Sequence, residues 1–67
     1  MPRRFLLTPR QREVLSEAKK GKNAAQIAHK LGISEHTVNS YFIEAYRRLG
    51  ARNRAHAVAL AVSLGEI

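Results

Sequence analysis

The sequence predicts an all-α fold, a four-helix bundle in one domain that spans residues 1–67. Three observations carry this prediction. Helix-capping residues recur along the chain, a glycine follows each apolar segment, and within each segment the apolar residues are mostly spaced by three or four positions. A chain of this length can build only one core, because only roughly 60% of its unfolded surface can be buried on folding.

The first helix is expected over residues 9–20. Thr8 is a suitable N-cap, Pro9 fits the first helical position because its missing N–H would be unsatisfied there, and Gln11 completes a capping box. Gly21 ends the helix, after two lysines that favour the negative end of the helix dipole. The apolar stripe consists of Val14, Leu15 and Ala18, with Leu7 as a hydrophobic staple.

The second helix is expected to be short, barely two turns. Asn23 is its N-cap, Gln26 completes a second capping box, and Gly32 stops the helix. Its apolar residues are Ala24, Ile27, Ala28 and Leu31.

The third helix is expected over residues 35–49. Ser34 is its N-cap, Glu35 at the first position favours the helix dipole, and Gly50 follows its last residue. Its core stripe is predicted to consist of Val38, either Tyr41 or Phe42, Ala45 and Leu49.

The last helix is expected from Asn53 to Gly65. Alanine and valine recur on nearly every face of it, so it carries more apolar surface than a chain of this size can cover. This pattern implies a partner surface. The alternative is an alanine-rich helix whose small exposed side chains contact nothing.

The second and third helices, joined by a tight turn at residues 32–34, form a candidate helix-turn-helix. In such a unit the third helix lies in the major groove of DNA. Outside its core stripe, the candidates for base contact are His36, Asn39, Ser40 and Ile43. Asn39 can pair with adenine through two hydrogen bonds, Ser40 can donate or accept, and Ile43 can touch a thymine methyl. Ile43 as an isolated surface hydrophobe is the alternative.

Contacts to the DNA backbone are expected from helix starts and flexible cations, since such contacts position a protein without reading sequence. The candidates are Lys22, Asn23, Lys30, Thr37, Tyr41 and Arg47. Asn23 is also a helix cap, and Lys22 and Lys30 are alternatively plain solvated charges. Glu13 and Arg54 are expected to meet as a structural pair between the first and last helices, with a phosphate contact as the alternative for Arg54.

The charge balance favours a polyanionic partner. Twelve Lys and Arg residues stand against five Glu, which gives a net charge of +7, and residues 1–7 include a short basic arm.

Other chemistries find no support in the sequence. There is no cysteine, and His29, His36 and His56 lack metal-ligand spacing, so no metal and no cofactor are expected. The chain has no nucleophile elbow, Gly-rich phosphate loop or carboxylate pair, and we expect no enzyme. The longest apolar run, residues 57–62, is too short to cross a membrane, so a cytoplasmic location is expected.

Three separated motifs resemble the LuxR-type (GerE) DNA-binding domain. They are LTPRQREVL at residues 7–15, AAQIAHKLGISEHTV at 24–38 and RRLGARNRAHAVALA at 47–61. The resemblance covers nearly the whole chain, and residues 37–61 look most like the quorum-sensing branch. It implies a four-helix DNA-binding domain of bacterial transcription regulators that forms dimers through its fourth helix. On this basis the dimer interface is expected at Val58, Ala61 and Val62.

The resemblance also assigns roles by position. It implies that Thr37 lies near a phosphate, that Val38 is structural, and that Asn39 occupies a base-reading position where the family most often has lysine. The other departures from the usual residues are at Gln11, Tyr41 and Ala45. A capping box survives with glutamine, and a tyrosine hydroxyl can still reach a phosphate.

The first functional hypothesis is therefore sequence-specific binding of double-stranded DNA by a transcriptional regulator, as a homodimer on two half-sites. RNA polymerase is a further partner under this hypothesis. The alternative is a protein-interaction adaptor or anti-activator that heterodimerises with a full-length regulator. The controlling signal is expected to act outside these 67 residues, whether the chain stands alone or is the effector part of a longer regulator.

Overall fold

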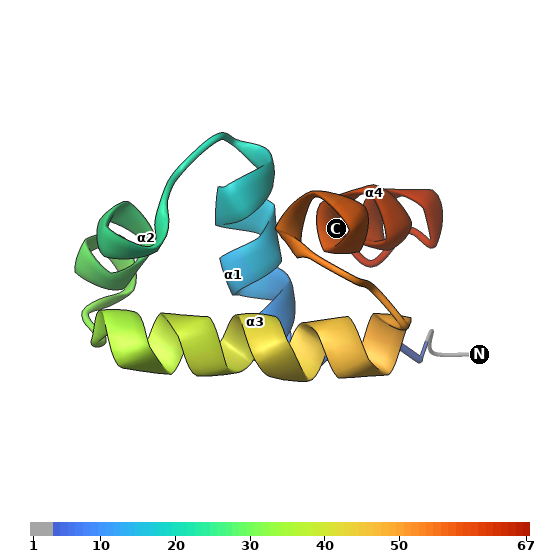
Figure 1. Cartoon of the computed structure of the whole chain (residues 1–67), viewed down its shortest axis with the longest axis horizontal. Coiled ribbons are helices and arrows are strands. Elements are labelled where there is room, and N and C mark those ends of the chain that lie inside the picture. Colours follow the sequence, from blue (N-terminus) through green and yellow to red (C-terminus); the bar gives the residue numbers. More distant parts are fainter. Residues whose placement is uncertain (1–3) are drawn as a thin grey trace.

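The computed structural model describes residues 4–67, and the first three residues of the predicted basic arm lie outside the described part. The four helices are α1 (Pro9–Lys19), α2 (Ala24–Leu31), α3 (Glu35–Leu49) and α4 (Arg54–Ser63), as Figure 1 shows. No strand occurs within residues 4–67. The predicted all-α fold of four helices is confirmed.

The helix starts follow the predicted capping residues. Thr8 and Asn23 each accept a hydrogen bond from the backbone N–H three residues on, and both capping boxes are closed by a glutamine. Ser34 caps α3 in the same way, through the N–H of Thr37. These side chains satisfy N–H groups that have no partner within their own helix.

The bounds of α4 differ from the prediction at both ends. Asn53 is the N-cap and not the first helical residue, because its backbone is extended and its side chain accepts from the N–H of His56 at 2.9 Å. The helix ends at Ser63, two residues before Gly65. Helix α4 is therefore shorter than the helix that the sequence pattern predicted.

The turn between α2 and α3 depends on Gly32. This residue caps the end of α2 in the left-handed conformation, with φ of 68°, and its N–H bonds back to the carbonyls of Ala28 and His29. Residues with a side chain rarely adopt this conformation, so glycine allows the chain to reverse within three residues.

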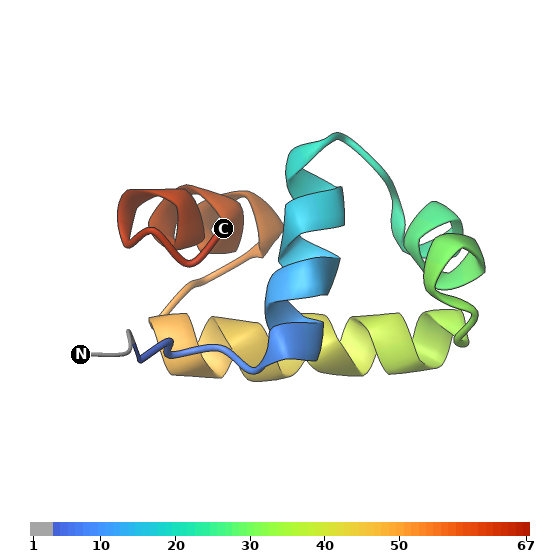
Figure 2. The same ribbon diagram turned by 180° about the vertical axis from the view of Figure 1, so that it is seen from behind.

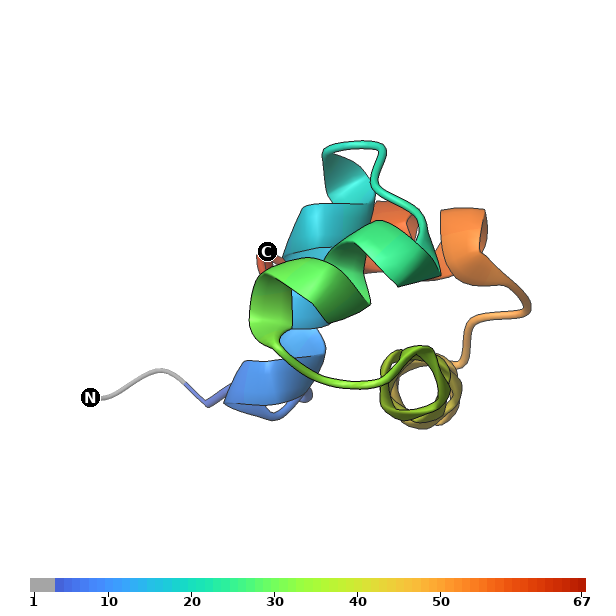
Figure 3. The same ribbon diagram turned by 90° about the vertical axis from the view of Figure 1, so that its left-hand side faces the viewer.

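Helix α3 is the longest helix, and the other helices lie to one side of it. Figures 1 and 2 show α2 near one end of α3, α4 near the other, and α1 crossing between them. In the view along α3 in Figure 3, the remaining helices are all on the same side of its axis. One face of α3 is therefore packed and the opposite face is open to solvent.

The core lies where α1, α2 and α4 meet the packed face of α3. Leu15, Ile27, Val14 and Val38 are its largest fully buried side chains. The remaining buried apolar residues are Leu7, Ala18, Ala28, Phe42, Ala45, Ala57 and Ala61. Of the two alternatives for the third helix, Phe42 is the buried residue and Tyr41 is only half-buried. None of the helices formed by residues 4–67 is long and apolar enough to cross a membrane.

The segment ahead of α1 is tied to the end of the chain. The buried carboxylate of Glu66 accepts hydrogen bonds from the backbone N–H groups of Leu6 and Leu7, at 3.1 and 2.9 Å. Arg48 donates to the carbonyl of Leu6, and the guanidinium of Arg12 lies over the ring of Phe5. Glu66 therefore replaces the pairing that a strand or helix would otherwise give these backbone groups.

Candidate nucleic-acid interface

The open face of α3 carries the four residues predicted to contact bases. His36, Asn39, Ser40 and Ile43 are all exposed, and we call them the outer face of α3. Their spacing of three, one and three residues places them on one side of a helix. On the opposite side, Val38, Phe42 and Ala45 are buried in the core.

Ile43 is the apolar member of the outer face, with 51% of its surface exposed. It is not part of the hydrophobic core and does not pack against it. Asn39 makes no hydrogen bond within the described residues, so its amide is available for an outside partner. Ser40 donates its hydroxyl to the carbonyl of His36 at 3.1 Å, which leaves its oxygen available as an acceptor.

Two of the predicted backbone-contacting residues flank the outer face on the half-buried side. Thr37 and Tyr41 are both partly exposed. The hydroxyl of Thr37 lies 2.8 Å from that of the N-cap Ser34, so the start of α3 holds two hydroxyls and free helical N–H groups together. Such a helix start favours an anion. Arg47 is exposed and pairs loosely with Glu44 at 3.3 Å.

A buried carboxylate on α1 binds three lysines, two from the segment before α2 and one from the last turn of α2. Glu17 is almost completely buried, and its oxygens lie 3.3, 3.1 and 2.5 Å from the ammonium groups of Lys20, Lys22 and Lys30. We call these four residues the Glu17 cluster. Hydrogen bonds from Lys30 and then Lys22 hold the pKa of Glu17 at about 2, although burial acts to raise it. The carboxylate in turn raises the pKa of Lys30.

The cluster changes the interpretation of Lys22 and Lys30. Both were predicted as flexible cations, but both are held by one internal acid. The net charge of the Glu17 cluster remains positive, because it has three lysines and one carboxylate. Sequence reasoning missed Glu17, whose only signal was an acid on the apolar side of the first helix, next to Leu15 and Ala18.

Asn23 is committed to its structural role. Its side-chain oxygen accepts from the N–H of Gln26 at 2.9 Å, and the side-chain oxygen of Gln26 accepts from the N–H of Asn23, also at 2.9 Å. The residue is exposed at the start of α2.

The three residues expected at a dimer interface do not share a surface. Val62 is 48% exposed and Val58 is half-buried, but Ala61 is completely buried in the core. The prediction for Ala61 is therefore wrong, because its side chain packs inward against its own chain. Ala55 and Ala59, which were not singled out, are exposed on α4.

The expected pair between Glu13 and Arg54 is also wrong. Glu13 pairs with Arg10 on the exposed surface of α1, at 2.8 Å. Arg54 instead donates to the backbone carbonyl of Lys22, and its guanidinium carbon lies 5.2 Å from the centre of the Phe42 ring. Arg54 is a structural tie, but its partners are α3 and the turn before α2.

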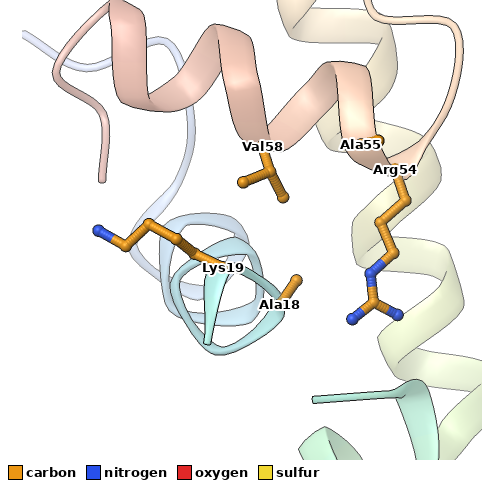
Figure 4. A pocket seen from close by; sticks show the side chains of 5 residues that line it. All are labelled: Ala18, Lys19, Arg54, Ala55 and Val58. Carbon is orange, nitrogen blue, oxygen red and sulfur yellow. The ribbon is translucent and has the colours of Figure 1, made fainter. Parts of the chain in front are cut away.

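A shallow hollow lies between α1 and the start of α4. Figure 4 shows its lining, with Ala18 and Lys19 from α1 facing Arg54, Ala55 and Val58 from α4. Its walls are mostly apolar.

The histidines lie apart from one another. His29 and His36 are exposed, and His56 accepts a hydrogen bond from the N–H of Arg52 at 3.1 Å. Within residues 4–67, no three His, Asp or Glu side chains come together in a way that could hold a metal ion.

The family model described as "Bacterial regulatory proteins, luxR family" matches residues 6–61. The chain belongs to this family. The match spans all of α1, α2 and α3 and most of α4, so the helix-turn-helix of α2 and α3 is the family's helix-turn-helix. The family is one of transcriptional regulators, and membership implies DNA binding.

Relatives agree with this assignment. The chain is 52% identical over 56 residues to the transcriptional activator protein BjaR1 of Bradyrhizobium diazoefficiens, and this covers 84% of the chain and 23% of BjaR1. It is 51% identical over 65 residues to the HTH-type quorum sensing-dependent transcriptional regulator RpaR of Rhodopseudomonas palustris, covering 97% of the chain and 27% of RpaR. The chain thus spans about a quarter of the length of these luxR-family relatives.

The fold of the luxR-family domain is also matched by a solved structure. The transcription factor GerE superimposes with a TM-score of 0.89 at 33% identity, over 94% of this chain and 94% of that one. The predicted resemblance to the LuxR-type (GerE) domain, with quorum-sensing regulators among the relatives, is confirmed.

Proposed function

We propose that the chain is a sequence-specific domain for double-stranded DNA that acts in bacterial transcription regulation, with α3 in the major groove. The observation that carries this proposal is the outer face of α3. Four residues able to touch base edges are exposed on one side of a helix whose other side is core. An α-helix fits the major groove, which is about 12 Å wide.

The remaining contacts follow from this placement. Thr37, Tyr41 and Arg47 flank the outer face, and Lys22 and Asn23 stand at the start of α2, the helix that crosses the backbone in a helix-turn-helix. Lys30, in the last turn of α2 and paired with Glu17, is the third cation proposed to contact the DNA backbone. Under this proposal the net charge of +7 supplies the attraction that is independent of sequence.

The domain is proposed to act as a homodimer on two half-sites, in the cytoplasm. An apolar strip along α4 is left uncovered by the rest of the chain. It consists of the exposed residues Ala55, Ala59 and Val62 and the half-buried Val58. Two such strips related by a two-fold axis would bury each other. We propose the whole of residues 1–67 as one such domain, with RNA polymerase or a full-length regulator as further partners.

Selection from a random duplex library tests the proposal. The purified domain should enrich one sequence with two half-sites about one helical turn apart, and should bind it at least tenfold more tightly than a scrambled duplex. If the library shows no enrichment while size-exclusion chromatography shows a complex with a full-length luxR-family regulator, the chain is an adaptor and the proposal fails.

A further inference from the structure

Arg54 is the one side chain of α4 that reaches both the recognition helix and the turn before α2, among the contacts of the described residues. Its guanidinium donates to the carbonyl of Lys22 and lies 5.2 Å from the centre of the Phe42 ring. Figure 4 shows the side chain leaving the start of α4 and extending past the end of α1. A planar guanidinium suits this place, because it can stack on an aromatic ring and donate at its edge at the same time.

The carbonyl that Arg54 holds lies next to the cap of α2. Lys22 immediately precedes Asn23, the N-cap, and follows Gly21, whose φ is 91°. The N–H of Lys22 is bonded only weakly to the carbonyl of Glu17, at 3.4 Å. Among the described residues, the other backbone hydrogen bonds of this turn run back to α1 or forward to α2, so the bond from Arg54 is the one that joins the turn to α4.

The ring that Arg54 touches belongs to the helix that carries the outer face. Phe42 is buried, next in sequence to Ile43 and two residues after Ser40. One guanidinium thus connects the turn at Lys22 to the helix of Ser40 and Ile43. The spacing between these two elements must match the spacing between a groove and its flanking phosphates.

We propose that Arg54 is a positioning residue for DNA binding: it holds the turn at Lys22 and Asn23 at the right distance from α3 for both to contact DNA at once. The inference rests on the proposed function. Under this proposal Arg54 touches no DNA itself, since its guanidinium is held against the Lys22 carbonyl and the Phe42 ring.

Substitution of Arg54 by methionine tests the role directly. Arg54→Met keeps an unbranched apolar stem but has no donor, and Arg10→Met is the matched control, because it removes the same charge from an exposed pair on α1. Affinities are measured for the selected duplex and for a scrambled one at about 0.15 M salt. Arg54→Met should lose roughly three- to tenfold on both duplexes, because the phosphate contacts at the turn are weakened and no base contact is changed. Arg10→Met should stay near wild type, and Arg54→Lys, which restores a charged donor group but not the planar guanidinium, should recover part of the loss.

A double-mutant cycle with Lys22→Ala separates positioning from a direct contact. If Arg54 acts through the turn, Lys22→Ala with Arg54→Met should lose less than the product of the two single losses, because both weaken the phosphate contact proposed for the Lys22 ammonium group. Losses that multiply would overturn the proposal, as they would mean that Arg54 has its own phosphate. Equal binding by Arg54→Met and Arg10→Met would overturn it as well.

NMR of the free protein tests the same role if Arg54→Met does not fold. The backbone amide signals of Arg54→Lys are then compared with those of the wild type. Those of Lys22 and Asn23 should shift while that of Asn39 stays, and unchanged turn signals would contradict the proposal. A wild-type domain that binds no duplex would instead contradict the proposed function.

Discussion

Asn39 combines exposure with chemistry that is specific for one base. Its amide can donate to and accept from adenine together, whereas a lysine at this place would favour guanine. It stands one turn into α3, after the capped start that holds Thr37 and Ser34. The residue type was readable from the sequence. Its exposure also followed from the sequence, because Val38 and Ala45 indicated which side of the helix is core, although the choice between Tyr41 and Phe42 was left open.

Replacement of Asn39 by alanine should lower the preference for the selected site. We expect Asn39→Ala to lose about 1 to 3 kcal/mol on that site and little on a scrambled duplex, since only the base contact is removed. The control is Lys22→Ala, which should weaken both duplexes alike. Fluorescence anisotropy titrations give the affinities, and an unchanged site preference in Asn39→Ala would contradict the assigned direction of α3.

Glu17 shows what residue patterns leave out. Lys20 and Lys22 are three and five positions from the acid, but Lys30 reaches it only because α2 packs against α1. No local pattern contains that contact. The same holds for Glu66, which meets Leu6 and Leu7 across nearly the whole chain length.

The Glu17 cluster should make stability depend on pH in the acid range. The pKa of Glu17 is about 2 in the folded chain, against 4.5 for a free side chain, so the folded state binds its proton more weakly than the unfolded state. The stabilisation is therefore complete above about pH 4.5 and is lost as the pH falls towards 2.

Chemical denaturation of Glu17→Gln checks this dependence. The variant should be less stable than wild type at pH 7, and the difference in free energy of unfolding should shrink between pH 4.5 and 2. Glu13→Gln is the control, because Glu13 is an exposed acid that pairs with Arg10 on the surface of α1. A difference for Glu17→Gln that stays constant across this range would rule out the lysine pairs as its cause.

At the scale of helices, the starts were predicted closely because each cap is a local hydrogen bond. Thr8, Asn23 and Ser34 act where expected, and Gly32 ends α2 in the left-handed conformation. Helix α4 was less predictable, since alanine fits both core and surface. Ala57 and Ala61 are buried while Ala55 and Ala59 are exposed, and only the packing of α4 on α1 and α3 decides between them.

A charge on the exposed strip of α4 should separate dimerisation from folding. Val62→Glu should abolish the proposed dimer and leave the helix content and the thermal midpoint close to wild type, because the side chain is 48% exposed. Ser63→Glu places the same charge on the neighbouring exposed residue, outside the strip. Sedimentation equilibrium with and without DNA measures the assembly. If Val62→Glu dimerises as well as Ser63→Glu, another surface forms the dimer.

At the scale of the whole molecule, charge and shape act together. The excess of cations belongs to no single helix, but α3 packs against the other three helices on one side only and leaves its opposite side open to a partner (Figure 3). The three proposed phosphate contacts made by cations are Lys22, Lys30 and Arg47. A dimer would then neutralise about six phosphates, and the logarithm of its affinity should fall with the logarithm of salt with a slope of about −5.

The most direct test of the proposed DNA recognition is an equilibrium titration of the wild-type domain with the selected and the scrambled duplex between 50 and 200 mM salt. The selected duplex should bind more tightly at every salt concentration, and both affinities should fall steeply, by roughly 10³ for the selected one over this range. Equal binding of the two duplexes, or no binding of either at 50 mM salt, would contradict the recognition of DNA sequence by the outer face of α3.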